Sequence, residues 1–180
     1  DVDLGELPME IQGAAYCPGT INLRSFRGLT LDDFRRDFEI NLLGAVQFPP
    51  ACLPGLKQAA GSDPASVVLF STVAVGNGFP LHASVAAAKG AVEGLTRSLA
   101  AEWAPAIRVN CLAPALTDTT LTASLTSTPE KRTAMAGKYP LNRLGEPNDL
   151  ASMARVLLSP ESSWITGQVI AVDGGIPRAI

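Results

Sequence analysis

Several polar residues in the middle of the chain have side chains that could hold an oxygen atom and move a proton. Asn41 lies in the sequence Glu-Ile-Asn-Leu-Leu-Gly, and Lys89 lies in an alanine-rich stretch. Ser71 and Thr72 end an apolar run, and the only histidine, His82, stands between this hydroxyl pair and the lysine. Together these groups supply donors, acceptors and a titratable nitrogen. Each residue alone has an ordinary structural explanation, but their order along the chain favours one shared site.

The elements that must position these residues are predicted from short apolar runs that alternate with longer helical patterns. Strands are expected at residues 13–17, 66–71, 107–112 and 168–172. Parallel strands need long crossovers, so this alternation predicts an α/β fold with a parallel sheet covered on both faces. Ligands bind beyond the carboxyl ends of the strands in such sheets. The loops at these ends, which contain Gly19, Ser71 and Pro114, are therefore expected to form any site.

Helices are predicted between the strands. One begins at Thr30, whose hydroxyl is suited to cap it. Pro49 and Pro50 are expected to kink or interrupt this helix because each lacks an amide donor. Further helices are expected over residues 84–103, where alanine is frequent, and over residues 147–158.

Composition excludes several classes of protein. Apolar residues make up 47% of the 180 residues and charged residues 17%, which excludes a disordered chain and a coiled coil. The net charge of −3 offers no basic surface for nucleic acid, and no apolar run approaches the roughly 18 residues of a membrane span. Cys17, Cys52 and Cys111 match neither a zinc site nor a disulfide framework. We expect them to be small buried residues of a cytoplasmic protein without a metal.

The motifs of the chain, taken in order, resemble those of the short-chain dehydrogenases/reductases. Within this family they are most similar to those of the 3-oxoacyl-acyl-carrier-protein reductase-like members. The matching segments include Asn41 in its helix, the hydroxyl pair at 71–72, the helix of Lys89, and residues 108–114, 144–147 and 165–175. The resemblance covers essentially the whole chain. It implies a Rossmann-type, doubly wound parallel sheet in three layers, NAD or NADP as the cofactor, and a small carbonyl or alcohol compound as the substrate.

The resemblance also implies roles for individual residues. Asn41 matches the residue that holds a water in a proton relay, Lys89 the residue that binds the nicotinamide ribose, and Thr72 the residue that orients the substrate oxygen. Contacts with the cofactor are implied at the positions that match the family's cofactor loops, which are Asp1, Val2, Cys17, Pro18, Gly19, Lys89, Pro114, Thr117 and Thr119, with Asp3 and Leu4 as the alternative to the first two.

One position departs from the family in a way that matters for catalysis. The family's general acid/base is a tyrosine one helical turn before the lysine, and that position is Val85 here. A valine cannot transfer a proton, and the loss of such a group typically costs about 10²–10⁴ in rate. Three alternatives stay open. Another group supplies the proton, with His82 preferred over Tyr16; or the chain binds the cofactor without catalysis; or it binds no nucleotide.

The family pattern enters this chain only after two strands. The chain contains no G-x-x-x-G-x-G turn after a first strand, where the family holds the pyrophosphate. We therefore expect residues 1–180 to form a single Rossmann-type domain whose opening strands and glycine-rich loop precede Asp1. The choice between NAD and NADP stays open, because the residues that make it follow the family's second strand.

Two further expectations concern surfaces. The threonine-rich segment 117–133 is expected to be a surface loop or flap, and the stretch up to residue 139 to shape the substrate pocket. The helices that contain Asn41 and Lys89 resemble those that pair between subunits in the family. The resemblance therefore implies a homodimer or homotetramer.

Overall fold

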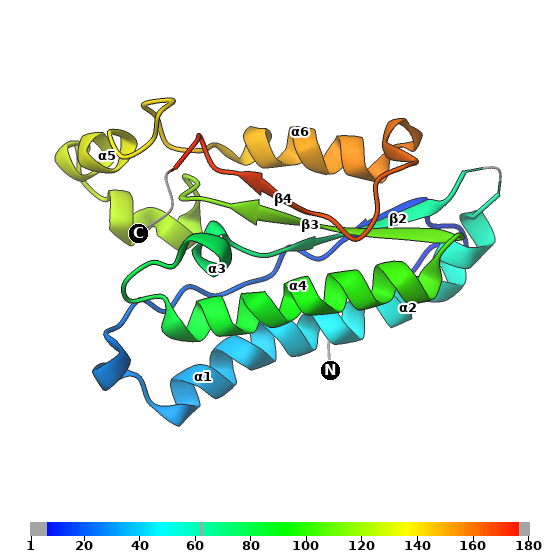
Figure 1. Ribbon diagram of the computed structural model, residues 1–180, viewed down its shortest axis with the longest axis horizontal. Coiled ribbons are helices and arrows are strands. Elements are labelled where there is room, and N and C mark those ends of the chain that lie inside the picture. The colour runs from blue at the N-terminus through cyan, green and yellow to red at the C-terminus, as the bar shows by residue number, and fades with distance from the viewer. Residues whose placement is uncertain (1–6, 62, 177–180) are drawn as a thin grey trace.

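The computed structural model describes residues 7–61 and 63–176, and it shows a parallel sheet between two layers of helices (Figure 1). The predicted contacts of Asp1, Val2, Asp3 and Leu4 lie outside these residues. Each predicted strand is present, with small shifts at the ends. In the described residues the sheet has the order β1-β2-β3-β4 and every neighbouring pair is parallel, the strands being β1 (Gly13–Ala15), β2 (Ala65–Phe70), β3 (Ile107–Pro114) and β4 (Val169–Val172).

One face of the sheet is covered by α2 (Gly44–Ala59) and α4 (Ala83–Trp103). The short helix α1 (Leu31–Phe38) packs against α4, and a π-helical turn, η2 (Glu39–Leu43), joins α1 to α2. Leu56 of α2 and Val92 of α4 pack with Val67 and Val109 of the central strands in the larger buried cluster. The predicted cap is confirmed, because the Thr30 side chain accepts a hydrogen bond from the backbone N–H of Asp33 at 3.2 Å.

The other face is covered by α6 (Pro147–Leu158), whose Leu157 packs with Val68 and Leu112. The connections from β1 to β2 and from β2 to β3 place their helices on one face, whereas the connection from β3 to β4 places α6 on the opposite face. All three connections step in the same direction across a parallel sheet. The third connection therefore has the opposite hand from the first two, which is rare because such crossovers nearly always share one hand.

The remaining short elements lie near the ends of the strands. They are η1 (Phe26–Gly28), α3 (Val73–Asn77), η3 (Thr120–Thr126), α5 (Pro129–Ala136) and η4 (Pro160–Ser162). Residues 117–133 were expected to form a surface loop or flap, and the loop was wrong for much of the segment, which is helical. Two of its threonines are caps: Thr119 precedes η3, and the Thr128 side chain accepts from Lys131 N at 3.3 Å, with Pro129 in the first turn of α5.

Of the two effects expected of Pro49 and Pro50, a kink or an interruption of the helix, the interruption was wrong. The helix α2 continues through both of them and through Pro54 to Ala59. Each proline removes one hydrogen bond, but Pro49 is buried on the same helix as Cys52 and Leu56. Burial of this apolar face against the sheet offsets the missing bonds, because tertiary packing supplies most of the stability of a helix.

The cysteines divide into two groups. Cys52 and Cys111 are buried as predicted, whereas Cys17 is exposed, which corrects the expectation for that residue. Cys17 lies two residues after the end of β1, beyond the buried Tyr16, where the chain has left the sheet and its side chain is exposed. Among the described helices, none is long and apolar enough to cross a bilayer.

Candidate functional site

Asn41 lies in the π-helical turn η2 and is completely buried. Its side-chain amide donates to Thr20 Oγ1 at 2.7 Å and to the backbone carbonyl of Asp37 at 2.9 Å, while its Oδ1 accepts from the backbone N–H of Thr20 at 3.1 Å. Single π turns within helices are frequent at functional sites, because the extra residue turns a side chain out of the helical register. The amide of Asn41 is thus held against Thr20, in the loop that follows β1.

Lys89 lies on the sheet-facing side of α4, with only 7% of its surface exposed. Its Nζ donates to the backbone carbonyl of Phe70, at the end of β2, over 2.8 Å. Burial penalises the charged form and lowers the pKa of Lys89 to about 8, against an opposing influence of Cys111 and Cys17. Phe70 O is its hydrogen-bond partner among the described residues, which leaves N–H groups of the ammonium for a ligand.

Gly19 brings these two side chains together. A Cβ placed on Gly19 would lie 3.2 Å from Asn41 Oδ1 and 3.4 Å from Lys89 Nζ. The amide oxygen and the amine therefore face the same small space, and this space stays open only because residue 19 has no side chain. The loop after β1, the turn η2 and the helix α4 thus converge on one point beyond the carboxyl ends of the strands. A donor and an acceptor around an open space can hold a hydroxyl group.

The hydroxyl groups of Ser71 and Thr72, which follow β2, both make hydrogen bonds within the protein. Thr72 caps α3 by accepting from Ala74 N at 3.3 Å, and its Oγ1 lies 3.5 Å from the carbonyl of Pro114 at the end of β3. Ser71 is buried and donates to Glu93 Oε1 at 2.8 Å. Thr72 therefore lies at the expected place, between the ends of two central strands, but a substrate oxygen would have to compete for its proton.

His82 lies immediately before α4, and its ring is held on one side. Its Nδ1 lies 2.7 Å from the carbonyl of Pro80, and its ring packs edge-on against Phe79. A carbonyl only accepts, so Nδ1 carries the proton and Nε2 keeps its lone pair in the neutral ring. Val85 is buried one turn before Lys89, on the same face of α4. In the described part of the chain the structure does not join His82 to Asn41 or Lys89 through any contact.

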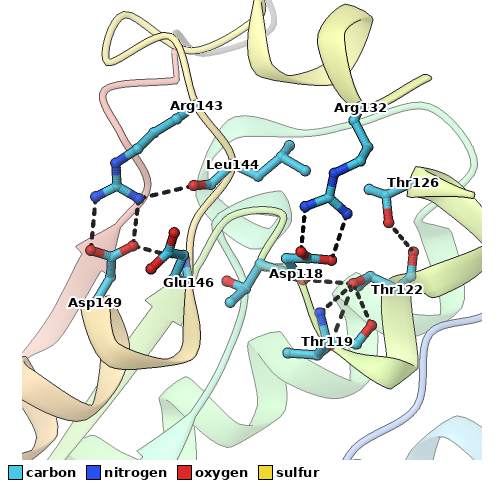
Figure 2. A network of polar contacts seen from close by, with 10 residues as sticks. Asp118, Thr119, Thr122, Thr126, Arg132, Arg143, Leu144, Glu146 and Asp149 are labelled. Atoms are coloured by element: carbon cyan, nitrogen blue, oxygen red, sulfur yellow. Dashed lines mark hydrogen bonds and ion pairs between the residues drawn. The ribbon is translucent and has the colours of Figure 1, made fainter. Parts of the chain in front are cut away.

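The positions predicted to follow β3 form a separate group. Thr117 is buried, donates to the carbonyl of Ala115 at 3.1 Å and pairs with Gly145, while Thr119 opens η3 and bonds to Thr122. Figure 2 shows how two arginines fasten the surrounding segments. Both terminal nitrogens of Arg132 in α5 donate to the carboxylate of Asp118. The two terminal nitrogens of Arg143 donate to the carboxylate oxygens of Asp149 in α6 at 2.7 Å and 2.8 Å.

Each of these arginines forms an ion pair with a carboxylate, so its charge stabilises the loop and is not left unpaired for a ligand. The pKa of Asp149 falls to about 2 because Arg143 and the backbone N–H of Glu146 stabilise its carboxylate. A cavity of about 180 Å³ lies beside this group, between the loop after β3 and the turn after β4, with Tyr139 and Leu116 in its lining. Tyr139 OH accepts from the backbone N–H of Leu116 at 3.2 Å, and this hydrogen bond joins two residues that line the cavity.

Sequence reasoning missed several polar residues that support the site. Thr20 and Asp37 hold Asn41, and Glu93 accepts the Ser71 proton. The spacing of Asp37 four residues before Asn41 was a usable signal, since such residues share a helical face. Tyr16, the weaker candidate for proton transfer, is buried and donates to the carbonyl of Ile40 at 2.9 Å. Burial also raises the pKa of the Cys111 thiol to about 12, with a further contribution from Glu93, so no thiolate forms beside Lys89 at neutral pH.

A parallel sheet between helical layers, with an amide and an amine gathered at the carboxyl ends of its strands, defines a Rossmann-type α/β protein. A family model described as enoyl-(acyl carrier protein) reductase matches residues 3–177. The peroxisomal 2,4-dienoyl-CoA reductase of Saccharomyces cerevisiae is 34% identical over 96% of this chain and 56% of its own length. The dehydrogenase/reductase SDR family member 4 of Homo sapiens is 35% identical over 87% of this chain and 55% of its own length. The chain belongs to the short-chain dehydrogenase/reductase family.

Solved structures agree with this assignment. A short-chain dehydrogenase/reductase from Brucella melitensis superposes with a TM-score of 0.85 at 32% identity, covering 94% of this chain and 66% of that one. The ligand-free aldohexose dehydrogenase of Thermoplasma acidophilum gives a TM-score of 0.84 at 28% identity, covering 93% and 68%. The predicted family and fold class are thereby confirmed. The chain spans about half the length of the relatives it matches in sequence.

Proposed function

We propose that this chain forms the nicotinamide end of an NAD(P)-dependent oxidoreductase that interconverts a carbonyl and a hydroxyl group on a small molecule. The observation that carries the proposal is the convergence of Asn41 Oδ1 and Lys89 Nζ on the open side of Gly19. Family membership supports the same activity. The choice of a carbonyl or hydroxyl substrate follows from the oxygen-binding groups at this point, namely an amide, an ammonium and the nearby hydroxyl of Thr72.

The residues present fit the nicotinamide cofactor. The ammonium of Lys89 has N–H groups available for the ribose hydroxyls, and the space above Gly19 is the cradle that a side chain would fill. Cys17, Pro18 and Gly19 follow β1, and Pro114 ends β3, so these loops border the same edge of the sheet. Thr117 and Thr119 lie on the loop that follows β3, beyond Pro114. When bound, the cofactor supplies or accepts a hydride.

Replacing Gly19 by alanine tests this fit. The added methyl group would occupy the space 3.2 Å from Asn41 and 3.4 Å from Lys89, tighter than most real contacts of a Cβ. We expect the dissociation constant of NADPH or NADH to rise by about 10-fold or more, because a lost charged hydrogen bond is worth about 1.5–3 kcal/mol. Fluorescence titration measures it. Gly61→Ala, at a glycine with open space around it, is the matched control and should leave the affinity unchanged.

The proton needed for reduction of a carbonyl must come from a group other than Val85. His82 supports this role, because the bond from Nδ1 to Pro80 fixes the tautomer and leaves Nε2 free to exchange a proton. His82 also lies just before the first turn of α4, three residues before Val85 in the sequence. Thr72 would orient the substrate oxygen between β2 and β3, and Lys89 would provide positive charge one turn deeper in the helix.

Replacing His82 by alanine is expected to lower the turnover number by about 10²–10⁴-fold, the usual contribution of a positioned acid or base. The affinity for the cofactor should stay nearly the same, since His82 has no contact with Asn41 or Lys89 within the described residues. Steady-state turnover with a panel of carbonyl substrates, together with cofactor titration, gives both numbers. An H82A protein with undiminished turnover would remove His82 from the mechanism.

A second candidate function is cofactor binding without catalysis. Both nearby hydroxyl groups already make hydrogen bonds within the protein, because Thr72 caps α3 and Ser71 donates to Glu93. The buried side chain at position 85 is a valine, which cannot transfer a proton. Both observations favour this second function. Binding of NADH or NADPH without oxidation by any carbonyl substrate would establish this alternative. Turnover that depends on His82 would eliminate it.

The proposal also covers the oligomeric state of the protein and the cellular compartment in which it works. We infer a homodimer or homotetramer, supported by exposed apolar side chains along the first helical layer, Leu31, Leu43 and Val46. A reducing compartment such as the cytoplasm is supported by the three free thiols, of which Cys17 is exposed.

A further inference from the structure

The hydrogen bonds around Asn41 continue to a buried carboxylate. Thr20 Oγ1 donates to Asp37 Oδ1 at 2.7 Å and accepts from Asn41 Nδ2 at 2.7 Å. Asp37 lies in the last turn of α1, four residues before Asn41, and is 1% exposed. Its other oxygen, Oδ2, is buried and has no hydrogen-bond partner among the described residues. A buried carboxylate with an idle oxygen is costly for folding, so its presence calls for a reason.

The chemistry of the donors fixes the direction of every bond in this network. The backbone N–H of Thr20 can only donate, so the atom of Asn41 that faces it is the oxygen Oδ1. The backbone carbonyl of Asp37 can only accept, so the atom that faces it is the nitrogen Nδ2. A carboxylate also only accepts, which commits the single Thr20 hydroxyl proton to Asp37. The hydroxyl oxygen is then available to the second N–H of Asn41.

The consequence is a single orientation for the Asn41 amide. Both of its N–H groups are directed to the side of Asp37 and Thr20, and its oxygen is directed to the space over Gly19 that it shares with Lys89. A flipped amide would place N–H groups opposite the N–H of Thr20 and against the ammonium of Lys89. It would also place its oxygen against the carbonyl of Asp37.

We propose that Asp37 and Thr20 are positioning residues: two backbone groups set the direction of the Asn41 amide, and the side chains of Thr20 and Asp37 hold it firmly in place with its oxygen toward Lys89 and the space over Gly19. This inference rests on the proposed function for the role of Asn41 in turnover, but the lock itself, meaning this hold on the amide, is a property of the folded chain. Asp37 thus acts through Thr20 and Asn41 without touching cofactor or substrate. The free-energy cost of burying the Asp37 carboxylate is thus accounted for by its role in holding the Asn41 amide.

Two matched pairs of variants test the lock. Thr20→Val removes the hydroxyl at constant shape, whereas Thr20→Ser keeps it. Asp37→Leu removes the acceptor, whereas Asp37→Asn keeps a carbonyl oxygen that can face Thr20. In the purified protein we expect T20V and D37L to lower kcat by about 10–100-fold, the scale of a slightly misplaced group. The KM for the cofactor should change by less than about 2-fold, and T20S and D37N should retain most of kcat, because they conserve the bond that orients the amide.

A second measurement reads the lock without any turnover. Nitrogen-15 NMR identifies the Asn41 side-chain N–H₂ signals by their loss in Asn41→Asp, and hydrogen exchange measures their protection. We expect protection at least 10-fold above that of exposed asparagine side chains in the parent protein and in T20S, and its loss in T20V. Rapid exchange in the parent protein, or full protection in T20V, would overturn the proposal even if the variants were inactive. Protection that follows the predicted pattern in a protein without turnover would uphold the lock and refute the proposed function alone.

Discussion

Substitution of Val85 by tyrosine is expected to raise the turnover number by about 10²–10⁴-fold. The new phenol would lie one helical turn before Lys89 on the same face of α4, where the buried ammonium favours phenolate over phenol. A phenol paired with a cation can donate a proton to a carbonyl at neutral pH, which valine cannot do. Steady-state oxidation of NADPH or NADH by carbonyl substrates gives the ratio of kcat between V85Y and the parent protein.

Val85→Phe is the control, because it adds the same ring without the hydroxyl. Val85 is buried, so the ring itself has a packing cost that V85F measures through its thermal unfolding. The phenol should also relieve the need for His82, so the double variant V85Y/H82A should keep the activity of V85Y. A V85Y protein that folds like V85F and turns over no faster than the parent would show that residue 85 does not face the reacting atoms.

Substitution of Lys89 by methionine should have opposite effects on activity and stability. We expect turnover to fall by about 10²–10⁴-fold, since the ammonium holds the ribose and provides the positive charge of the site. At pH 7 the free energy of unfolding should rise by about 2 kcal/mol. Burial lowers the pKa of Lys89 to about 8 from 10.5, and the lost hydrogen bond to Phe70 offsets part of the gain.

The stability gain has a defined pH window. Below pH 8 the lysine is charged in both the folded and the unfolded chain, and the full cost of burying that charge is present. Between about pH 8 and pH 10.5 the folded chain holds fewer protons than the unfolded chain, so the parent protein gains stability as the pH rises. The advantage of K89M should therefore be largest at pH 7 and shrink toward pH 10.5. Urea unfolding at several pH values measures it, with Lys57→Met on the exposed side of α2 as the control. A constant difference between K89M and the parent would contradict a buried ammonium.

The sequence predicted most of the fold because its signals are local. Apolar runs and caps such as Thr30 placed the strands and helices within a few residues of their observed bounds. The failures came from long-range packing. Pro49 and Pro50 break local rules, yet α2 continues because its buried face is held by the sheet. The threonines of 117–133 were interpreted as loop residues, whereas Thr119 and Thr128 begin short helices.

The site divides in a similar way. Asn41, Thr72 and Lys89 could be selected because a resemblance gave them roles, and the structure places Asn41 and Lys89 around Gly19. The support of Asn41 by Thr20 joins the loop after β1 to a helix, a contact that no local pattern encodes. The low pKa of Lys89 likewise arises from burial, which only the folded chain shows.

Titration of the purified protein with NADPH and with NADH, in the parent chain and in K89M side by side, tests the central claim most directly. The account predicts saturable binding of at least one of the two nucleotides and a dissociation constant at least about 10-fold higher in K89M, consistent with lost hydrogen bonds from a charged group. Absence of saturable binding to the parent protein, or equal affinity in K89M, would contradict a nicotinamide site built on Gly19, Asn41 and Lys89.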